Sequence, residues 1–297
     1  MRVGPFISAC AAAVVAMLVG CGGSAEPRPD LAFVSTRDGS YELFAMNADG
    51  SRQRRLTHGD ATSLSYEIQP SWSPDGRRIA FASNRAGSVA IFVMRADGSG
   101  TRRLTSSTAE GTEPSWSPDG KRIVFSRNTP GHIEVMRADG TGARRVTNDL
   151  ATEAEPAWSP DGRWIAYVRN TPGTDIKEVW LVHPDGSGRR QLTHLSATSL
   201  GPSWSPDSRR ISFASNSSST NFHIYEIRLD GRGLRLLTQQ TSDDFDPAWS
   251  PGGKEIAFSR DGAIWTVAAG GGHERQLTNP KDNDSAPAWK PRARAAS

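Results

Sequence analysis

The sequence predicts an all-β fold, a six-bladed β-propeller, and three observations support this prediction. First, a tryptophan two residues after a proline recurs at spacings of 44, 42, 46, 45 and 40 residues, at Trp72, Trp116, Trp158, Trp204, Trp249 and Trp289. Second, the same order of short β-type segments and glycine turns fills each interval. Third, no segment after residue 20 carries a sustained apolar pattern of helical period. Repeats of about 40 residues with four strands each are typical of propeller blades.

One repeat shows the expected elements in order. Residues 70–73 form a short first strand, and the Ser-Pro-Asp-Gly turn that follows suits a proline at its second position and a glycine at its fourth. Residues 78–83 and 90–94 form the second and third strands, 96–100 form a hairpin turn, and 102–105 form the fourth strand. The strands are apolar on both faces, so each small sheet should pack between two others, as radial stacking provides.

The two ends of the repeat region indicate how the ring closes. The region begins at Leu31 with a second strand and ends at Pro287 to Trp289 with a first strand. We therefore expect the C-terminal strand to complete the N-terminal blade, which removes a free sheet edge. The propeller should occupy residues 31–291, with a tail at 292–297, and the six tryptophans should have structural roles.

The first thirty residues differ from the rest of the chain. Arg2 precedes an apolar run that ends with Leu18-Val19-Gly20-Cys21. The run is shorter than the roughly 20 residues of a membrane-spanning helix, so residues 1–20 are predicted to be a signal peptide. The ending resembles the lipobox of bacterial lipoproteins, in which the cysteine is acylated; an ordinary signal peptide is the alternative. Residues 21–30 would then be the lipidated Cys21 and a tether, and the exported protein would face the periplasm or the cell exterior.

Composition narrows the class of protein. The chain has two cysteines, Cys10 and Cys21, so the mature domain would contain no disulfide. Roughly 260 residues can bury a sufficient core without one. The formal net charge is +3, and the arginines recur at fixed repeat positions where acids balance them. We interpret them as a solvated rim and expect no binding to nucleic acid.

The repeat motif resembles that of a known family. The segment Pro-Ser-Trp-Ser-Pro-Asp-Gly-Arg-Arg-Ile-Ala-Phe at 70–81, with Arg-Ala-Asp-Gly at 95–98 and Arg-Arg-Leu-Thr at 102–105, is similar to the WD-like repeat of TolB-type propellers. The resemblance covers Leu31 to Pro291 and implies a six-bladed propeller. Family members can carry an α/β domain ahead of the propeller; here we expect the tether alone in that place.

Function should be sought where the repeats differ. Acidic residues gather just before the first strands, at Glu67, Glu110, Glu113, Glu153, Glu155, Asp243, Asp244, Asp246, Asp282 and Asp284. The loops between second and third strands carry Arg37, Arg85, Arg127, Arg169 and Arg260. Both patterns are interrupted in the fifth blade, where residues 192–204 contain no acid. Because strands alternate in direction, both groups of loops should share one face of the propeller, around the mouth of its channel.

Two interpretations of these residues remain open. The acids and arginines could form a recognition site, with a carboxylate ring that attracts a cation, a basic peptide or an amine, since crowded carboxylates raise one another's pKa until a counter-ion binds. Alternatively, each acid pairs with the arginine of its own or a neighbouring blade and holds the loops in place.

The sequence favours a binding or scaffold protein over an enzyme. It contains no Gly-x-Ser-x-Gly elbow and no His-Glu-x-x-His spacing, so we predict no catalytic residues, no metal ligands and no cofactor. The expected partner is a cell-envelope protein or peptide, and the protein is expected to be a monomer. Two alternatives stay open: a lyase- or lactonase-like enzyme with a divalent cation in its channel, and a receptor for a glycan or small ligand with Phe222 and Phe245 as aromatic contacts.

Overall fold

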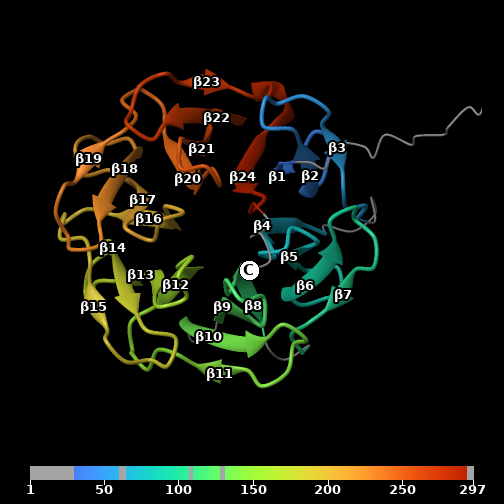
Figure 1. Cartoon of the computed structure of the whole chain (residues 1–297), viewed down its shortest axis with the longest axis horizontal. Helices are drawn as coiled ribbons and strands as arrows, with labels where there is room; N and C mark the ends of the chain where they lie inside the picture. The colour runs from blue at the N-terminus through green and yellow to red at the C-terminus, as the bar shows by residue number, and fades with distance from the viewer. Residues whose placement is uncertain (1–29, 60–64, 107–109, 128–130, 293–297) are drawn as a thin grey trace, which may run out of the picture.

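The computed structural model describes residues 30–59, 65–106, 110–127 and 131–292. These residues form six four-stranded antiparallel sheets arranged around a central channel (Figure 1). The predicted six-bladed propeller is therefore confirmed. Within the described residues no helix is long and apolar enough to cross a membrane. The predicted signal peptide and Cys21 lie outside the described residues.

The first three blades are as follows, each from its inner to its outer strand. The first blade consists of β24 (Asp284–Trp289), β1 (Leu31–Ser35), β2 (Glu42–Met46) and β3 (Arg54–Arg55). The second consists of β4 (Glu67–Trp72), β5 (Arg78–Ser83), β6 (Ala90–Arg95) and β7 (Arg102–Arg103). The third consists of β8 (Gly111–Trp116), β9 (Arg122–Arg127), β10 (His132–Arg137) and β11 (Arg144–Arg145).

The other three blades repeat this plan. The fourth consists of β12 (Glu153–Trp158), β13 (Ile165–Asn170), β14 (Lys177–Val182) and β15 (Arg190–Gln191). The fifth consists of β16 (Ser199–Trp204), β17 (Arg210–Ser215), β18 (His223–Arg228) and β19 (Arg235–Leu236). The sixth consists of β20 (Asp244–Trp249), β21 (Glu255–Arg260), β22 (Ala263–Ala268) and β23 (Arg275–Gln276), and a 3₁₀ turn, η1 (Pro280–Asp282), leads from it to β24.

The C-terminal strand closes the ring, as the sequence predicted. Strand β24 pairs antiparallel with β1, with Trp289 opposite Leu31 and Asp284 opposite Ser35. Just beyond the pair, the backbone N–H of Lys290 donates to the carbonyl of Asp30 at 2.7 Å. The first blade thus combines the two ends of the repeat region, and its inner edge is covered in the same way as in the other five blades.

Every inner strand contains a β-bulge at the same position. In the second blade Ile68 pairs with Ala82 and Ser71 pairs with Ala80, so two residues lie opposite one. The first bulge residue in each blade has a positive φ of about the left-handed value, 57°, 55°, 54°, 60°, 54° and 49° at Gln69, Glu113, Glu155, Gly201, Asp246 and Ala286. A proline follows each of them. Proline has no N–H to donate to a neighbouring strand, and an edge strand, here the innermost strand of each blade, tolerates such a residue. Such a bulge redirects a side chain out of the normal alternation of the strand.

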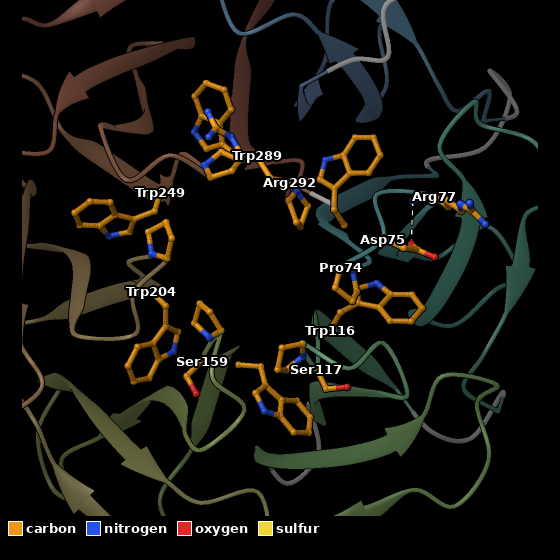
Figure 2. Close-up of a pocket in the computed structure, with 17 residues that line it drawn as sticks. Pro74, Asp75, Arg77, Trp116, Ser117, Ser159, Trp204, Trp249, Trp289 and Arg292 are labelled. Atoms are coloured by element: carbon orange, nitrogen blue, oxygen red, sulfur yellow. Dashed lines mark hydrogen bonds between the residues drawn. The ribbon is translucent and has the colours of Figure 1, made fainter. Parts of the chain in front are cut away.

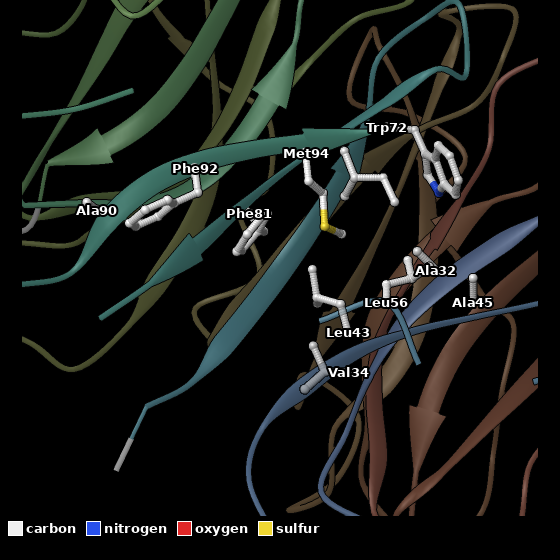
Figure 3. Packing of buried hydrophobic residues seen from close by; sticks show 11 residues of the cluster. Ala32, Val34, Leu43, Ala45, Leu56, Trp72, Phe81, Ala90, Phe92 and Met94 are labelled. Carbon is white, nitrogen blue, oxygen red and sulfur yellow. The ribbon is translucent and has the colours of Figure 1, made fainter. Parts of the chain in front are cut away.

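The hydrophobic core lies between the blades. Between the first and second blades, Leu43, Trp72, Phe81 and Met94 belong to one buried cluster (Figure 3). Equivalent clusters fill the other spaces, and five of the six repeat tryptophans are buried, whereas Trp289 is half-buried.

Arginine side chains of one blade cover tryptophan rings of the next. The Arg78 guanidinium lies 4.5 Å from the ring centre of Trp116, and Arg122 lies 4.8 Å from that of Trp158. The indole N–H of Trp204 donates to the carbonyl of Ala157 in the preceding blade at 2.9 Å. Apolar burial, cation–π contacts and interblade hydrogen bonds therefore combine to hold neighbouring blades together.

Candidate functional site

The central channel opens on two faces that differ in chemistry. At one end, a cavity of about 780 Å³ is lined by the six repeat tryptophans, the prolines of the Ser-Pro turns, Asp75, Arg77 and Arg292 (Figure 2). We call this end the turn face. The hairpin turns between third and fourth strands lie on it too, because the N–H of Ala96 donates to the carbonyl of Arg77 at 2.9 Å. The other end, the loop face, holds the loops between second and third strands and between blades.

The six bulge residues line the narrow end of the channel at the loop face. With the prolines that follow them, they surround a cavity of about 240 Å³. We call this set the mouth ring: Gln69, Glu113, Glu155, Gly201, Asp246 and Ala286. Of the sequence-predicted site residues, the structure thus brings together Glu113, Glu155 and Asp246. In the other three blades this position is Gln69, Gly201 or Ala286, none of which carries a charge. The negative charge is therefore distributed unevenly around the ring.

Hydrogen bonds connect the mouth ring from blade to blade. The N–H of Glu113 donates to the Gln69 side chain at 3.0 Å, and the N–H of Glu155 donates to the Glu113 carboxylate at 2.6 Å. The Glu155 carboxylate accepts the N–H of Gly201 at 2.5 Å. The Asp246 carboxylate accepts from the Ser259 hydroxyl at 3.1 Å. Each acidic side chain is therefore positioned by its neighbours, and at least one oxygen of each carboxylate already accepts a hydrogen bond.

Burial and mutual repulsion perturb these carboxyl groups. Burial, followed by the charge of Glu113, raises the pKa of Glu155 to about 7. Burial also raises the pKa of Asp246. Asp246 is exposed to water in the channel. Its pKa is nevertheless raised, because the surrounding inner strands replace most of the water that would solvate its charge. A positive group placed in the mouth would stabilise the ionised form of both acids.

A second set of acids lies two residues earlier, at the first residue of four inner strands. These carboxylates are almost completely buried: Glu67, Glu153, Asp244 and Asp284. Each forms an ion pair with an arginine at 2.5–2.9 Å: Glu67 with Arg85, Glu153 with Arg189, Asp244 with Arg260 and Asp284 with Arg37. In the third and fifth blades the same position is Gly111 or Ser199. These four acids hold loops in place, as the alternative interpretation of the sequence proposes, and do not line the channel.

The remaining predicted arginines pair with acids that the sequence analysis did not select. Arg127 contacts Glu134 at 3.0 Å, and Arg169 contacts Asp149 at 2.7 Å. In the fourth blade the partner of Glu153 is Arg189, which comes from the turn before β15. These partners lie 7 to 36 residues apart along the chain, and no local motif marks them. The mouth ring could have been identified from the sequence, because every ring residue immediately precedes the proline of its repeat.

The other predicted acids lie outside the channel. Glu110 is exposed, and exposed Asp243 accepts the backbone N–H of Phe222 at 2.8 Å. Asp282 lies 3.5 Å from Arg37 at the edge of the first blade. Phe222 and Phe245 pack against each other with ring centres 4.9 Å apart. The loop face therefore places an apolar aromatic pair in the sixth-blade region, next in sequence to Asp246.

The described residues contain no group of three or more His, Cys, Asp or Glu side chains that could hold a metal ion. The mouth cavity is lined instead by carboxylates, an amide and six prolines, all of them buried. Such a lining can accept hydrogen bonds and attract positive charge.

Comparison with known proteins agrees with this architecture. The chain matches the PD40 family model, described as the TolB beta propeller domain, over residues 7–196 and 113–293. The Tol-Pal system protein TolB of Desulfosudis oleivorans (strain DSM 6200 / JCM 39069 / Hxd3) is 41% identical over 66 residues. That segment covers 22% of this chain and only 14% of the relative.

Two solved structures share the fold. TolB from Acinetobacter baumannii superposes with a TM-score of 0.77 at 21% identity, covering 89% of this chain and 67% of that one. The putative TolB from Agrobacterium tumefaciens gives a TM-score of 0.68 at 20% identity, covering 89% and 99% of the two chains. At these identities the likeness is one of fold. The family model matches most of the sequence, and the chain therefore belongs to the TolB beta propeller domain family.

Proposed function

We propose that this protein is a lipid-anchored, extracytoplasmic propeller that docks a cell-envelope protein or peptide at the mouth ring of its loop face. The observation that carries the proposal is the position of Glu113, Glu155 and Asp246. Three inner strands present their carboxylates into one cavity of about 240 Å³. The protein acts as a monomeric binding module, and its chemistry is recognition.

The contrast between the two sets of acids supports this proposal. The carboxylates at the starts of the inner strands are neutralised by arginines 2.5–2.9 Å away. Among the described residues, no ion pair joins Glu113, Glu155 or Asp246 to an arginine, lysine or histidine. Their carboxylates therefore lack an ion-pair partner at a poorly solvated mouth, and a basic partner would supply a counter-charge.

The surroundings of the ring suggest the composition of the partner. Phe222 and Phe245 form a half-buried aromatic pair on the same face. Their exposed parts offer apolar area on the face that carries the acids. A segment with one or two basic residues next to an apolar or aromatic residue would satisfy both features, as is usual for binding centres that combine an apolar anchor with a charge.

Family membership supports a search in the cell envelope. The relative from Desulfosudis oleivorans is named as a Tol-Pal system protein. By analogy, we infer an envelope partner for this chain, which Cys21 would hold near its membrane through an acyl group.

The test is capture from envelope extract by the wild-type protein and by a Glu113→Gln, Glu155→Gln, Asp246→Asn variant. The replacements keep an oxygen that can accept the backbone N–H of the next blade, so the fold should survive. A control variant with Asp97→Asn, Asp139→Asn and Asp185→Asn removes three carboxylates from the turn face instead.

We expect one protein to be retained by the wild type and the control and lost by the mouth variant, with retention falling as salt is raised. Equal retention by all three would exclude the mouth ring as the docking site. Loss of the captured protein from both variants would show that capture depends on the total charge of the propeller and not on the mouth ring.

A further inference from the structure

The turn face carries a ring of positive side chains. In five blades the residue after the Ser-Pro turn is basic, and the chain after β24 supplies the sixth: Arg77, Lys121, Arg163, Arg209, Lys254 and Arg292. All six are exposed. Arg77 and Arg292 line the wide cavity at this end of the channel (Figure 2). A second, outer row of exposed arginines lies in and after the hairpin turns of the same face, at Arg95, Arg102, Arg137, Arg144, Arg228, Arg235 and Arg275.

The acids of this face are engaged by their own turns. Asp75 accepts the Ser73 hydroxyl at 2.5 Å and the N–H of Arg77 at 3.0 Å. Asp119, Asp161 and Asp207 repeat these contacts in their blades. The inner ring therefore sets six cations against four aspartates whose carboxylates fold back onto the backbone. The outer row likewise sets seven arginines against the five aspartates of the hairpin turns, Asp49, Asp97, Asp139, Asp185 and Asp230, so this face carries an excess of positive charge.

The chain also enters the propeller on this face. Asp30, the last residue of the tether, accepts the N–H of Lys290 at 2.7 Å through its carbonyl. Its carboxylate accepts the N–H of Ala48 at 3.2 Å, in the hairpin turn of the first blade. Nine residues separate Cys21 from Leu31, and nine residues span at most about 30 Å. An acyl group on Cys21 would therefore hold the turn face, and not the loop face, next to the membrane.

We propose that the turn face lies against anionic lipid headgroups, with the cationic ring as its contact surface and the mouth ring directed away from the membrane. This proposal rests on the proposed anchor at Cys21. Anionic leaflets attract basic residues within about one Debye length. A basic surface against the headgroups would add electrostatic attraction to the hold of the lipid anchor. The propeller would thus present its docking site to partners outside the bilayer.

The first test removes the acyl group so that the surface alone is measured. The mature chain, residues 21–297 with Cys21→Ser, is mixed at low salt with vesicles of phosphatidylcholine, with or without phosphatidylglycerol, and bound protein is separated by flotation. We expect binding only to the anionic vesicles. Adding Arg77→Gln, Arg163→Gln and Arg209→Gln should weaken it about 100-fold, since each basic residue near such a surface contributes roughly fivefold. The matched Arg→Lys triple variant keeps the charge and should keep the binding.

Equal binding to neutral vesicles, or no effect of the glutamine variant, would overturn the proposal. Retention on heparin without retention on anionic vesicles would also overturn it, in favour of a soluble polyanion. The glutamine variant leaves the mouth ring unchanged and the mouth variant leaves the turn face unchanged. Loss of vesicle binding and loss of partner capture are therefore separate results.

The second test measures orientation. Single dyes are attached at Gly252→Cys on the turn face and at Ser217→Cys on the loop face, both in the mature chain, residues 21–297, with Cys21→Ser. A side chain at Gly252 meets only the flexible Arg292 side chain, at 3.5 Å, and Ser217 is exposed. A quencher on the lipid headgroup should quench the dye at 252 and leave the dye at 217 bright. Equal quenching, or the reverse order, would contradict the proposed orientation.

Discussion

Replacing Glu155 by glutamine should stabilise the protein, and more so as the pH rises. The carboxyl group has an ordinary pKa of 4.5, which burial and neighbouring Glu113 raise to about 7 in the folded protein. Between these values the folded state holds the proton more tightly than the unfolded state. The contribution of Glu155 to stability is therefore fully present below pH 4.5 and is lost as the pH rises through 7.

The magnitude follows from the same shift. A tenfold change in acid constant corresponds to about 1.4 kcal/mol, so the full shift corresponds to at most about 3 kcal/mol. Partial solvent access at the mouth reduces this to about 2 kcal/mol. Glutamine carries no charge to desolvate, and its side-chain oxygen can still accept the N–H of Gly201, which Glu155 accepts at 2.5 Å.

Urea unfolding of wild type and Glu155→Gln at pH 4.5, 6 and 8 measures the effect. The gain in the variant should grow by about 2 kcal/mol over this range. In a Glu113→Gln background the gain should be smaller, because the repulsive neighbour is already neutral. A constant difference at all three pH values would refute the reasoning, since the carboxyl group would then not be held in a charge-disfavouring site.

The remaining predictions concern packing, closure and anchoring. Arg260→Ala leaves the buried Asp244 carboxylate without its partner at 2.5 Å and should cost about 3–5 kcal/mol in urea unfolding; a cost below about 1 kcal/mol would mean that the pair contributes little. Trp158→Ala removes a ring that is 6% exposed and should cost about 3–5 kcal/mol; a near-neutral result would show that the tryptophans do not carry the interblade packing. A chain ending at Lys281 loses β24, so its thermal unfolding should no longer be cooperative, and a cooperative transition would argue against closure by that strand. Cys21→Ser should move the protein from the membrane to the soluble fraction of cells, and continued membrane association would remove the lipoprotein interpretation.

The fold was predictable because each repeat carries its own local signals. A proline two residues before each tryptophan marks an inner edge strand, and glycine turns mark the hairpins, so six copies reinforce one another. Closure of the ring was predictable too. The repeat region begins with a second strand at Leu31 and ends with a first strand at Trp289, and these two strands pair in one blade.

The site was less predictable because acids with similar local sequences have different environments. Glu153 and Glu155 are two residues apart, yet Glu153 is 1% exposed beside Arg189 and Glu155 lies at the channel. The separation arises from the bulge that begins at Glu155, which changes the direction of its side chain. Charge and spacing alone placed both residues in one ring, whereas the backbone conformation at the bulge assigns them to different roles.

Carboxyl footprinting of the protein in native envelopes tests the docking site most directly. Carbodiimide labelling of Glu113, Glu155 and Asp246 is compared between intact envelopes and the purified protein, with exposed Asp261 on the same face as the internal reference. If the mouth ring holds a partner, labelling of the three ring residues should fall in envelopes while that of Asp261 stays the same. Unchanged labelling of the ring residues would contradict docking at the mouth.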